Sequence, residues 1–459
     1  MTAVQAPGAP SPAPSAAPAR PAPRAARSFR GASRTTPGRY RLWSIATVVV
    51  LALATLAATA SAAQMRSSSA HADTHSGPVL VATQRLLSSI AEADAAASAA
   101  FLSGPNEDPE QRRLYEEALA RADGQVADIA SLAGDDAGIR SLLSKISVQL
   151  TQYSGLVEAA RASNRSGVAA ANGYLTQAVF QADQLVNGDV ATLATATQAS
   201  LRHDQDKRAK GFALAVVALL LALAVLAVAQ AVLFRRSRRL VNLPLAVATL
   251  LVLAALVWLV RANQASSDAI ARARSQGYDS IVVTTKLATA GFDAKAAETL
   301  AVITGDPGQR SEANTRAGLV AATPVTPEIV TAIRAGQANG GPGGLLGAAA
   351  SSAGSPRERA AVADTAVRWR RYEDTAAALR AAPNPAAAKA IAEGPLNADF
   401  NGFNFSLGAI LGQNESQFLN GLSSASGDAS GVPTATLLLL LVAIAASLWG
   451  FQLRINDYR

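Results

Sequence analysis

Four long apolar runs without any charged residue constrain this chain more than any other feature of its sequence. They cover residues 43–63, 211–234, 240–260 and 435–453. A helix needs about 20 apolar residues to cross the hydrocarbon core of a bilayer. Four uninterrupted runs of this length predict four transmembrane helices rather than the buried core helices of a soluble protein.

The first run has one alternative interpretation. It ends in ATASAAQ, and Ala60-Ser61-Ala62 has the small-residue form of a signal-peptidase site. About 40 residues precede the run, which is longer than an ordinary signal peptide allows. We therefore interpret it as an uncleaved anchor, whereas cleavage would leave three spans and place the N-terminus outside.

Basic residues are sorted among the segments between the runs. Residues 1–42 carry seven arginines and no acid, and residues 454–459 carry two arginines and one aspartate. Segment 64–210 carries 13 basic and 17 acidic residues, and segment 262–433 carries 14 and 15. The loop 235–239 between the second and third runs contains four arginines: Arg235, Arg236, Arg238 and Arg239.

This sorting predicts the topology. Cytoplasmic flanks of membrane spans carry an excess of Lys and Arg. The N-terminus, the arginine loop and the C-terminus are therefore expected in the cytoplasm, and segments 64–210 and 261–434 outside it. The net charge of +8 then reflects membrane orientation and predicts no nucleic-acid binding. The loop arginines are also candidates for contact with anionic lipid or a cytoplasmic partner.

The composition favours helices. Its apolar half is mostly Ala, Leu and Val, with 5% aromatic residues, and Ala and Leu are among the best helix formers. Runs that alternate β-branched or aromatic with polar residues, as strands do, are nearly absent. We therefore expect an all-α protein, apart from residues 1–42, whose Pro, Ala, Ser and Arg content is typical of a disordered tail.

The first large segment, 64–210, shows the spacing of packed antiparallel helices. Apolar residues recur every three or four positions along it, and breaks fall at Gly104-Pro105, Gly134 and Gly167. This periodicity predicts a four-helix bundle. The bundle's core positions include Tyr115, Leu119, Ala122, Val126, Ile129, Ala133, Ile139, Leu143, Ile146, Leu150, Tyr153 and Val157.

The second large segment, 261–434, resembles the first. Leu86 and Gly104 pair with Leu287 and Gly305 at one offset of 201 residues. We infer an internal duplication of a span–bundle–span unit. Within the second copy, residues 336–355 are rich in Gly, Ala and Ser, which predicts a flexible loop, and SASGDASGVP (424–433) predicts a break before the last span.

No pattern of catalytic residues is present. The chain has no cysteine and three histidines, of which His71 and His75 are four positions apart without an evident third ligand. No hydrolase or metalloprotease motif appears. The three expected cytoplasmic segments are too short to fold an output domain. We therefore expect no enzymatic activity, no cofactor and no bound metal.

Five polar residues are candidates for contact with a ligand or for a switch. Asp94 occupies a core position between Leu87 and Phe101, where a buried carboxylate needs a partner. Asp94 either pairs with an Arg or Tyr on a neighbouring helix, contacts an amine-bearing solute, or lies in a polar gap of a loosely packed bundle. The other four candidates are Asp293, Asn414, Arg368 and Arg371.

Short motifs carry a resemblance to known families. FLSG (101–104) and VITG (302–305), each followed by a turn that contains Asp-Pro, and QRRLYEEAL (111–119) resemble the first hairpin of four-helix sensor domains of bacterial chemoreceptors. The duplicated plan with a basic N-terminus resembles the actinobacterial GlnX-type four-span membrane signalling proteins. The resemblance implies relay of extracellular amino-acid availability, presented by a solute-binding lipoprotein, to a cytosolic Ser/Thr kinase.

These features together favour a plasma-membrane sensor or adaptor. Its expected partners are the lipid bilayer, an extracytoplasmic solute-binding protein and a cytosolic Ser/Thr kinase. A transporter or channel component is the first alternative, and the absence of ionisable residues inside the runs counts against it. A structural envelope protein without signalling is the second. The sequence does not specify the ligand or the oligomeric state.

Overall fold

The computed structural model describes residues 36–134, 136–168, 170–237, 242–337 and 341–456. All regular structure in these ranges is helical, which confirms the all-α prediction. The tail 1–35, Arg238 and Arg239 lie outside the described residues, as do the side chains of Arg235 and Arg236.

The chain divides into two compact units. The first, here called the apolar unit, comprises residues up to Thr55, Ala218–Ala254 and residues from Leu439 on. The second, here called the large unit, comprises Leu56–Val217 and Ala255–Leu438. Both predicted extramembrane segments therefore contribute to one compact body.

The described parts of the four apolar runs, from Leu243 on in the third run, lie in four helices, each long and apolar enough to cross a membrane. In the apolar unit, large apolar side chains such as Leu53, Leu221 and Leu250 are exposed on the helix surfaces. Such a surface is stable in hydrocarbon and not in water, which indicates a multi-pass membrane protein. The helices are α2 (Thr36–His71), α7 (Ala191–Ser237), α8 (Leu243–Arg272) and α16 (Val432–Asn456).

Two amide side chains connect helices inside the apolar unit. Gln230 Nε2 on α7 donates to Thr249 Oγ1 on α8 over 2.8 Å and to the Leu245 carbonyl over 3.1 Å. Asn242 Nδ2 donates to the Gly450 carbonyl of α16 over 3.0 Å. Interhelical hydrogen bonds of this kind stabilise helix packing where water is absent.

The first half of the large unit has one core surrounded by α3, α4, α5 and the helix formed by α6, η3 and α7. Ten of the twelve predicted core positions from Tyr115 to Val157 are buried, whereas Leu119 and Ala133 are half-buried at the edge of the core. Asp108 and Asp136 cap α4 and α5 by accepting hydrogen bonds from the first backbone amides. The bounds are α3 (Gly77–Leu102), α4 (Pro109–Leu132), α5 (Ala137–Arg165), α6 (Ala171–Gln184) and the π-helical segment η3 (Leu185–Val190).

The second half of the large unit, from α9 to α15, is less regular than the first. Between α9 and α13 the chain forms three short helices, and α12 occupies nine residues of the stretch predicted as a flexible loop, so that prediction was wrong there. Residues 338–340 of that stretch are outside the description. The bounds are α9 (Asp279–Thr304), α10 (Pro307–Val320), α11 (Pro327–Ala335), α12 (Gly344–Ser352), α13 (Pro356–Arg380), α14 (Pro385–Ile391), the π-helical segment η6 (Ala392–Leu396) and α15 (Asn397–Ser430).

The predicted break before the last span is also smaller than expected. Helix α15 continues through SASGDAS to Ser430, and α16 begins at Val432. Gly431 between them keeps right-handed helical dihedral angles, with φ −86° and ψ −14°. The small residues of this segment are compatible with a helix, and Pro433 lies in the first turn of α16, where its missing N–H is not needed.

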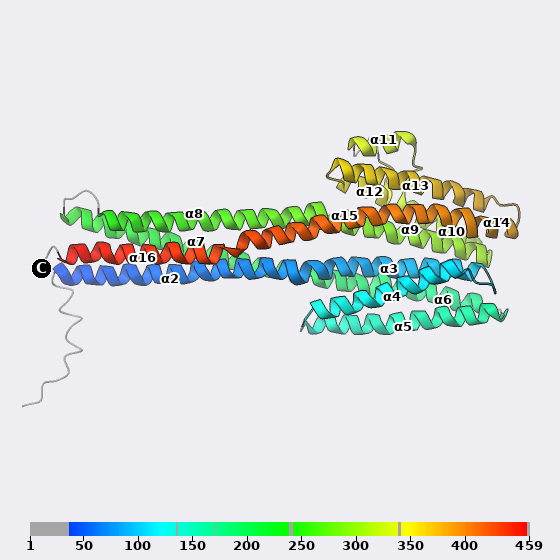
Figure 1. The fold of residues 1–459 in the computed structure, drawn as a ribbon, viewed down its shortest axis with the longest axis horizontal. Helices are drawn as coiled ribbons and strands as arrows, with labels where there is room; N and C mark the ends of the chain where they lie inside the picture. Colours follow the sequence, from blue (N-terminus) through cyan, green and yellow to red (C-terminus); the bar gives the residue numbers. More distant parts are fainter. Residues whose placement is uncertain (1–35, 135, 169, 238–241, 338–340, 457–459) are drawn as a thin grey trace, which may run out of the picture. The chain divides into compact units, whose positions relative to one another are not determined.

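Helix α3 occupies the centre of the large unit. It is buried at 21 of its 26 residues, whereas α4 is buried at six of 24. Figure 1 shows α4, α5 and α6 on one side of α3 and α9, α10 and α13 on the other. Because α3 is rich in alanine between Ala91 and Ala100, α9 packs closely against it. The two halves are therefore joined through α3 and α9.

Two π-helical segments interrupt helices at related positions. Segment η2 (Ala72–Ser76) joins α2 to α3, and η4 (Ala273–Tyr278) joins α8 to α9. Their first residues, Ala72 and Ala273, are 201 positions apart. This spacing equals the offset of the predicted duplication, which stays a prediction.

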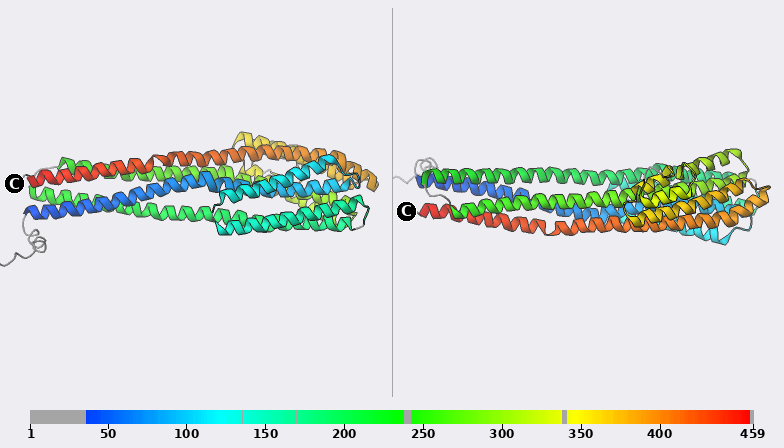
Figure 2. Two further views of the ribbon diagram at one scale, coloured as in Figure 1. Left: turned by 60° about the horizontal axis from the view of Figure 1, so that its bottom comes forward. Right: turned by 90° about the horizontal axis from the view of Figure 1, so that it is seen from above.

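Helix α15, the long orange helix in both views of Figure 2, packs against α13, α9 and η4. Its approach to η4 depends on small residues. A Cβ atom on Gly277 would lie 2.7 Å from the Phe418 Cα atom, and one on Gly421 would lie 2.7 Å from the Ala273 Cβ atom. Glycine at both positions lets the two backbones touch.

Candidate functional site

Two of the five predicted site residues meet at the junction of the two halves. Asp94 on α3 and Asp293 on α9 line one cavity of about 80 Å³. Its other polar lining residues are Asp183 on α6, Asn187 in η3, and Gln309, Glu312 and Arg316 on α10. This cavity, here called the inter-half cavity, is therefore lined by acidic side chains from both halves around the single guanidinium group of Arg316.

Arg316 connects these acids. Its Nη1 atom donates to Asp293 Oδ2 over 3.0 Å and lies 3.6 Å from Asp183 Oδ1. Its Nε atom donates to Glu312 Oε1 over 2.6 Å, an i,i+4 pair on α10. Because Asp183 belongs to the first half and Arg316 to the second, these contacts couple the two halves.

Asp94 is the most deeply buried acid of this junction, with 7% of its surface exposed. It lies about 30 residues beyond the end of the first apolar run, outside the membrane-spanning segments. Desolvation, followed by the charges of Asp293 and Asp183, raises the pKa of Asp94 to about 8. Desolvation also raises the pKa of Asp293 to about 6. At neutral pH Asp94 is therefore mainly a protonated carboxylic acid.

Tyr153 on α5 faces Asp94 from the first-half core. Its hydroxyl is buried beside the Asp94 carboxyl group, and hydrogen bonding between the two counteracts part of the rise in the pKa of Asp94. Desolvation and the nearby Asp94 charge raise the pKa of Tyr153 well above the ordinary value, so the phenol stays neutral. The sequence predicted a Tyr or an Arg beside Asp94, and the structure places both Tyr153 and Arg316 within electrostatic reach of its carboxyl group.

The second half carries an opposite charge at the repeat-related position. Lys295, 201 residues after Asp94, is 3% exposed, and its Nζ atom lies 5.0 Å from the centre of the Phe400 ring. Desolvation lowers the pKa of Lys295 to about 8. A buried acid on α3 and a buried base on α9 therefore both have pKa values of about 8.

The remaining predicted residues do not join this cavity. Asn414 on α15 is buried, and its Oδ1 atom has no hydrogen-bond partner within the described part of the chain. Arg368 on α13 pairs with Asp364 over 2.8 Å, and Arg371 is exposed on the same helix. The structure therefore separates the two arginines from the two aspartates, and it does not gather them into an anion-binding group.

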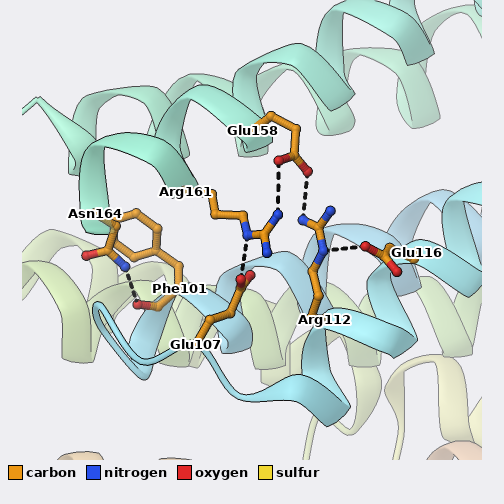
Figure 3. Close-up of polar contacts among 7 residues, drawn as sticks. All are labelled: Phe101, Glu107, Arg112, Glu116, Glu158, Arg161 and Asn164. Carbon is orange, nitrogen blue, oxygen red and sulfur yellow. Dashed lines mark hydrogen bonds and ion pairs between the residues drawn. The ribbon is translucent and has the colours of Figure 1, made fainter. Parts of the chain in front are cut away.

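A second polar cluster, which the sequence did not predict, joins the α3–α4 turn to α5. Arg112 Nη1 on α4 donates to Glu158 over 2.7 Å, and Arg161 on α5 pairs with Glu107 in the turn (Figure 3). Asn164 Nδ2 donates to the Phe101 carbonyl over 3.0 Å. These contacts surround a cavity of only about 20 Å³, so the cluster closes the end of the bundle and leaves little room for a solute.

Among the described residues, no group of three or more His, Cys, Asp or Glu side chains is arranged so that it could hold a metal ion. His71 and His75 stack with ring centroids 4.8 Å apart. The inter-half cavity can instead exchange a proton or accept a small cationic group, because its acids outnumber its single arginine.

Residues 68–206 match the family model of the actinobacterial sensor domain. No curated protein matches the chain. The matched segment begins in α2, includes α3 to α6 and ends in α7. It contains Asp94, Tyr153 and Asp183, whereas Asp293 and Arg316 come from outside it. The match supports a sensing role for this segment in an actinobacterial protein.

The sensor-domain match gives no position a ligand-binding role. Two of the residues that form the inter-half cavity, Asp183 and Arg316, were not among the predicted candidates. The only sequence signal for Arg316 is Glu312 four residues earlier, which predicts a surface ion pair and no contact with another half.

Proposed function

We propose that the chain is a plasma-membrane sensor or adaptor that relays an extracytoplasmic signal to a cytosolic partner such as a Ser/Thr kinase. In this proposal the large unit faces outward and receives the signal. The N-terminus, the arginine loop and the C-terminus face the cytoplasm. The chain acts as a relay without enzymatic activity of its own.

The uninterrupted helix α7 is the observation that carries the proposal. It begins at Ala191 beside the first-half core, contains the second apolar run and ends at Ser237. Leu193 near its start is fully buried in that core. A continuous helix passes a displacement of 1–2 Å at one end to the other without a separate domain for transmission.

The inter-half cavity supports the input side of the relay. A solute, or a solute-binding protein loaded with one, docks on the large unit and favours one arrangement of the halves. Arg316, which contacts acids from both halves, is positioned to respond to that change. A ligand shifts such an equilibrium only by its difference in affinity for the two arrangements.

The arginine-rich segments support the output side. Residues 1–42 and Arg235, Arg236, Arg238 and Arg239 form the most basic parts of the sequence. In the proposed topology they attract anionic lipid headgroups or an acidic surface of the partner. A displacement of α7 changes the position of the loop arginines relative to the lipid headgroups or the partner.

Removal of the basic segments tests this proposal. We expect deletion of residues 1–40, combined with glutamine at the four loop arginines, to reduce crosslinking to cytosolic partners at least tenfold in native membranes, because the capturing charges are lost. Binding of extracytoplasmic proteins should stay unchanged. Crosslinking followed by mass spectrometry measures both.

Glutamine at the exposed Arg334, Arg357 and Arg371 of the large unit is the matched control and should preserve cytosolic capture. Undiminished capture by the deletion variant would contradict the proposal. Solute flux across liposomes that contain the purified chain would instead favour a transporter or channel.

A further inference from the structure

A third cavity, of about 290 Å³, lies in the large unit where its helices approach the apolar runs. It is lined by parts of residues 68–80, 198–208, 270–283 and 418–422. The first of these segments follows the run 43–63, and the second precedes the run 211–234. The cavity therefore lies next to the membrane boundary.

Arg208 is the decisive residue of this cavity. Its side chain is 7% exposed, and its Nη2 atom makes one hydrogen bond, to Asn263 Oδ1 over 3.3 Å. No carboxylate among the described side chains pairs with it. An ionised group buried without a counter-charge is destabilising by several kcal/mol unless a ligand compensates for it.

The neighbouring charges increase the preference for an anion. Arg202 on α7 and Arg274 in η4 also line the cavity, whereas Asp279 is the one acidic residue among the described side chains that line it. Both additional arginines are exposed, so they are accessible from solvent. Three guanidinium groups against one carboxylate give a site that attracts negative charge.

The rest of the lining is apolar. Leu80 on α3, Ile270 on α8 and Val283 on α9 contribute to it, together with Phe418 and Leu422 from α15. Hydrophobic walls with a few convergent polar groups are typical of small-molecule sites. An inorganic anion alone would leave this apolar surface uncovered.

Both membrane-proximal π-helical segments contribute to this cavity. His71 and Ala72 come from the α2–η2 junction, and Arg274 and Tyr278 come from η4. Single-turn π segments inside α-helices occur frequently at functional sites. The Tyr278 hydroxyl accepts a hydrogen bond from Gln198 Nε2 over 2.9 Å, which holds η4 beside α7.

We propose that this cavity binds an amphiphilic anion. Its phosphate or carboxylate head pairs with Arg208, and its hydrocarbon chain covers Leu80, Phe418 and Leu422. An adjoining cavity of about 480 Å³ shares Arg208, Ile270 and Arg274 and reaches Phe212, inside the second apolar run. This continuity gives a membrane lipid a route to the site, and a free amphiphile carries the same chemistry.

Native mass spectrometry of the full chain in an uncharged detergent tests the proposal. We expect phosphatidylglycerol to be retained at least tenfold better than phosphatidylcholine, because only the former offers a net negative head. Decyl phosphate against decanol separates a free amphiphile from a lipid source. Retention of either anionic probe over its uncharged or zwitterionic partner supports the site.

Three variants assign the binding to this cavity. Arg208→Gln should reduce retention of the anionic probe about tenfold, and Arg208→Lys should restore part of it. Because Arg208→Gln can disturb folding, the exposed pair Arg202→Gln and Arg274→Gln provides a second test with the same expected direction. Arg272→Gln, an exposed neighbour outside the cavity, is the control and should retain the probe fully.

Equal retention of anionic and uncharged probes would overturn the proposal, and so would full retention by both the Arg208→Gln protein and the double variant. These measurements report binding at the cavity alone. A failure here is therefore separate from a failure of cytosolic capture, on which the proposed relay depends.

Discussion

Replacing Gly277 with alanine is expected to lower the stability of the large unit by about 3 kcal/mol. The new Cβ atom would lie 2.7 Å from the Phe418 Cα atom and 2.9 Å from the Phe418 backbone nitrogen. Backbone atoms cannot rotate away as a flexible side chain does, so α15 has to separate from η4. Thermal unfolding followed by circular dichroism in detergent should show Tm lower by several degrees.

Gly412→Ala is the matched control for this change. Gly412 is also a helical glycine, on the exposed face of α15, and a Cβ atom there meets no atom within 4 Å. Alanine has the higher helix propensity, so this variant should be slightly more stable than the parent, by up to about 1 kcal/mol. Equal Tm values for the two variants would show that α15 does not touch η4 as described.

Asp94→Asn is expected to make stability much less dependent on pH between about 5 and 8. In the folded protein burial raises the pKa of Asp94 to about 8, whereas 3.8 is the ordinary value that applies when the chain is unfolded. Between these values the folded state binds more protons than the unfolded state, so stability falls as pH rises. The loss is at most about 1.4 kcal/mol per pH unit for one group, which amounts to a few kcal/mol across the window.

Other titratable and charged groups near Asp94 set the pH range over which the parent and the Asp94→Asn protein can be compared. Asp183 on α6, Asp293 on α9, Arg316 on α10 and Tyr153 on α5 face Asp94. The pKa of Asp293 is raised to about 6, so Asp293 also makes stability fall as pH rises. Because both the parent and the Asp94→Asn protein contain Asp293, it does not account for a difference between them. The pKa of Lys295 is lowered to about 8, so above pH 8 it makes stability rise with pH. The comparison therefore ends at pH 8.

Tm measured from pH 5 to 8 checks this expectation. The parent protein should lose several degrees over the range, and the Asp94→Asn protein should lose clearly less. Asp128→Asn, at an exposed position on α4, should follow the parent curve. Parallel curves for the parent and Asp94→Asn would mean that Asp94 keeps its charge in the folded state.

The sequence predicted the helices of the first half well because each shows one regular stripe of apolar residues. Ile139, Leu143 and Ile146 recur every three or four positions, and all three are buried as expected. The four membrane-spanning candidates were predicted in a different way, from their length and lack of charge. Local periodicity is sufficient wherever one face of a helix packs and the other is solvated.

The packing of α3 against α9 could not be predicted in this way. Their contact surfaces are mainly alanine, which indicates helix formation and does not distinguish a buried face from an exposed one. Ala91 and Ala95 of α3 belong to the second-half core, although they lie in the first half of the sequence. The sequence analysis therefore predicted two separate bundles, whereas the structure has one body.

The candidate site was predicted only in part for the same reason. Asp94 was recognisable because an acid interrupts a core stripe, and Asp293 because it lies 201 residues after Glu92, close to the repeat-related position of Asp94. Arg316 and Asp183 lie far apart in the sequence and resemble ordinary surface residues of α10 and α6. Their meeting depends on the arrangement of the two halves, which no local pattern encodes.

The central position of α3 has a practical consequence for recombinant work on this chain. A fragment limited to residues 68–206 would carry α3 without α9, so Ala91, Ala95 and Leu102 would lose the neighbours that shield them. Such a fragment is expected to self-associate in solution. Fragments intended for crystallisation or ligand screening should keep both halves on one polypeptide, or supply α9 as a separate peptide.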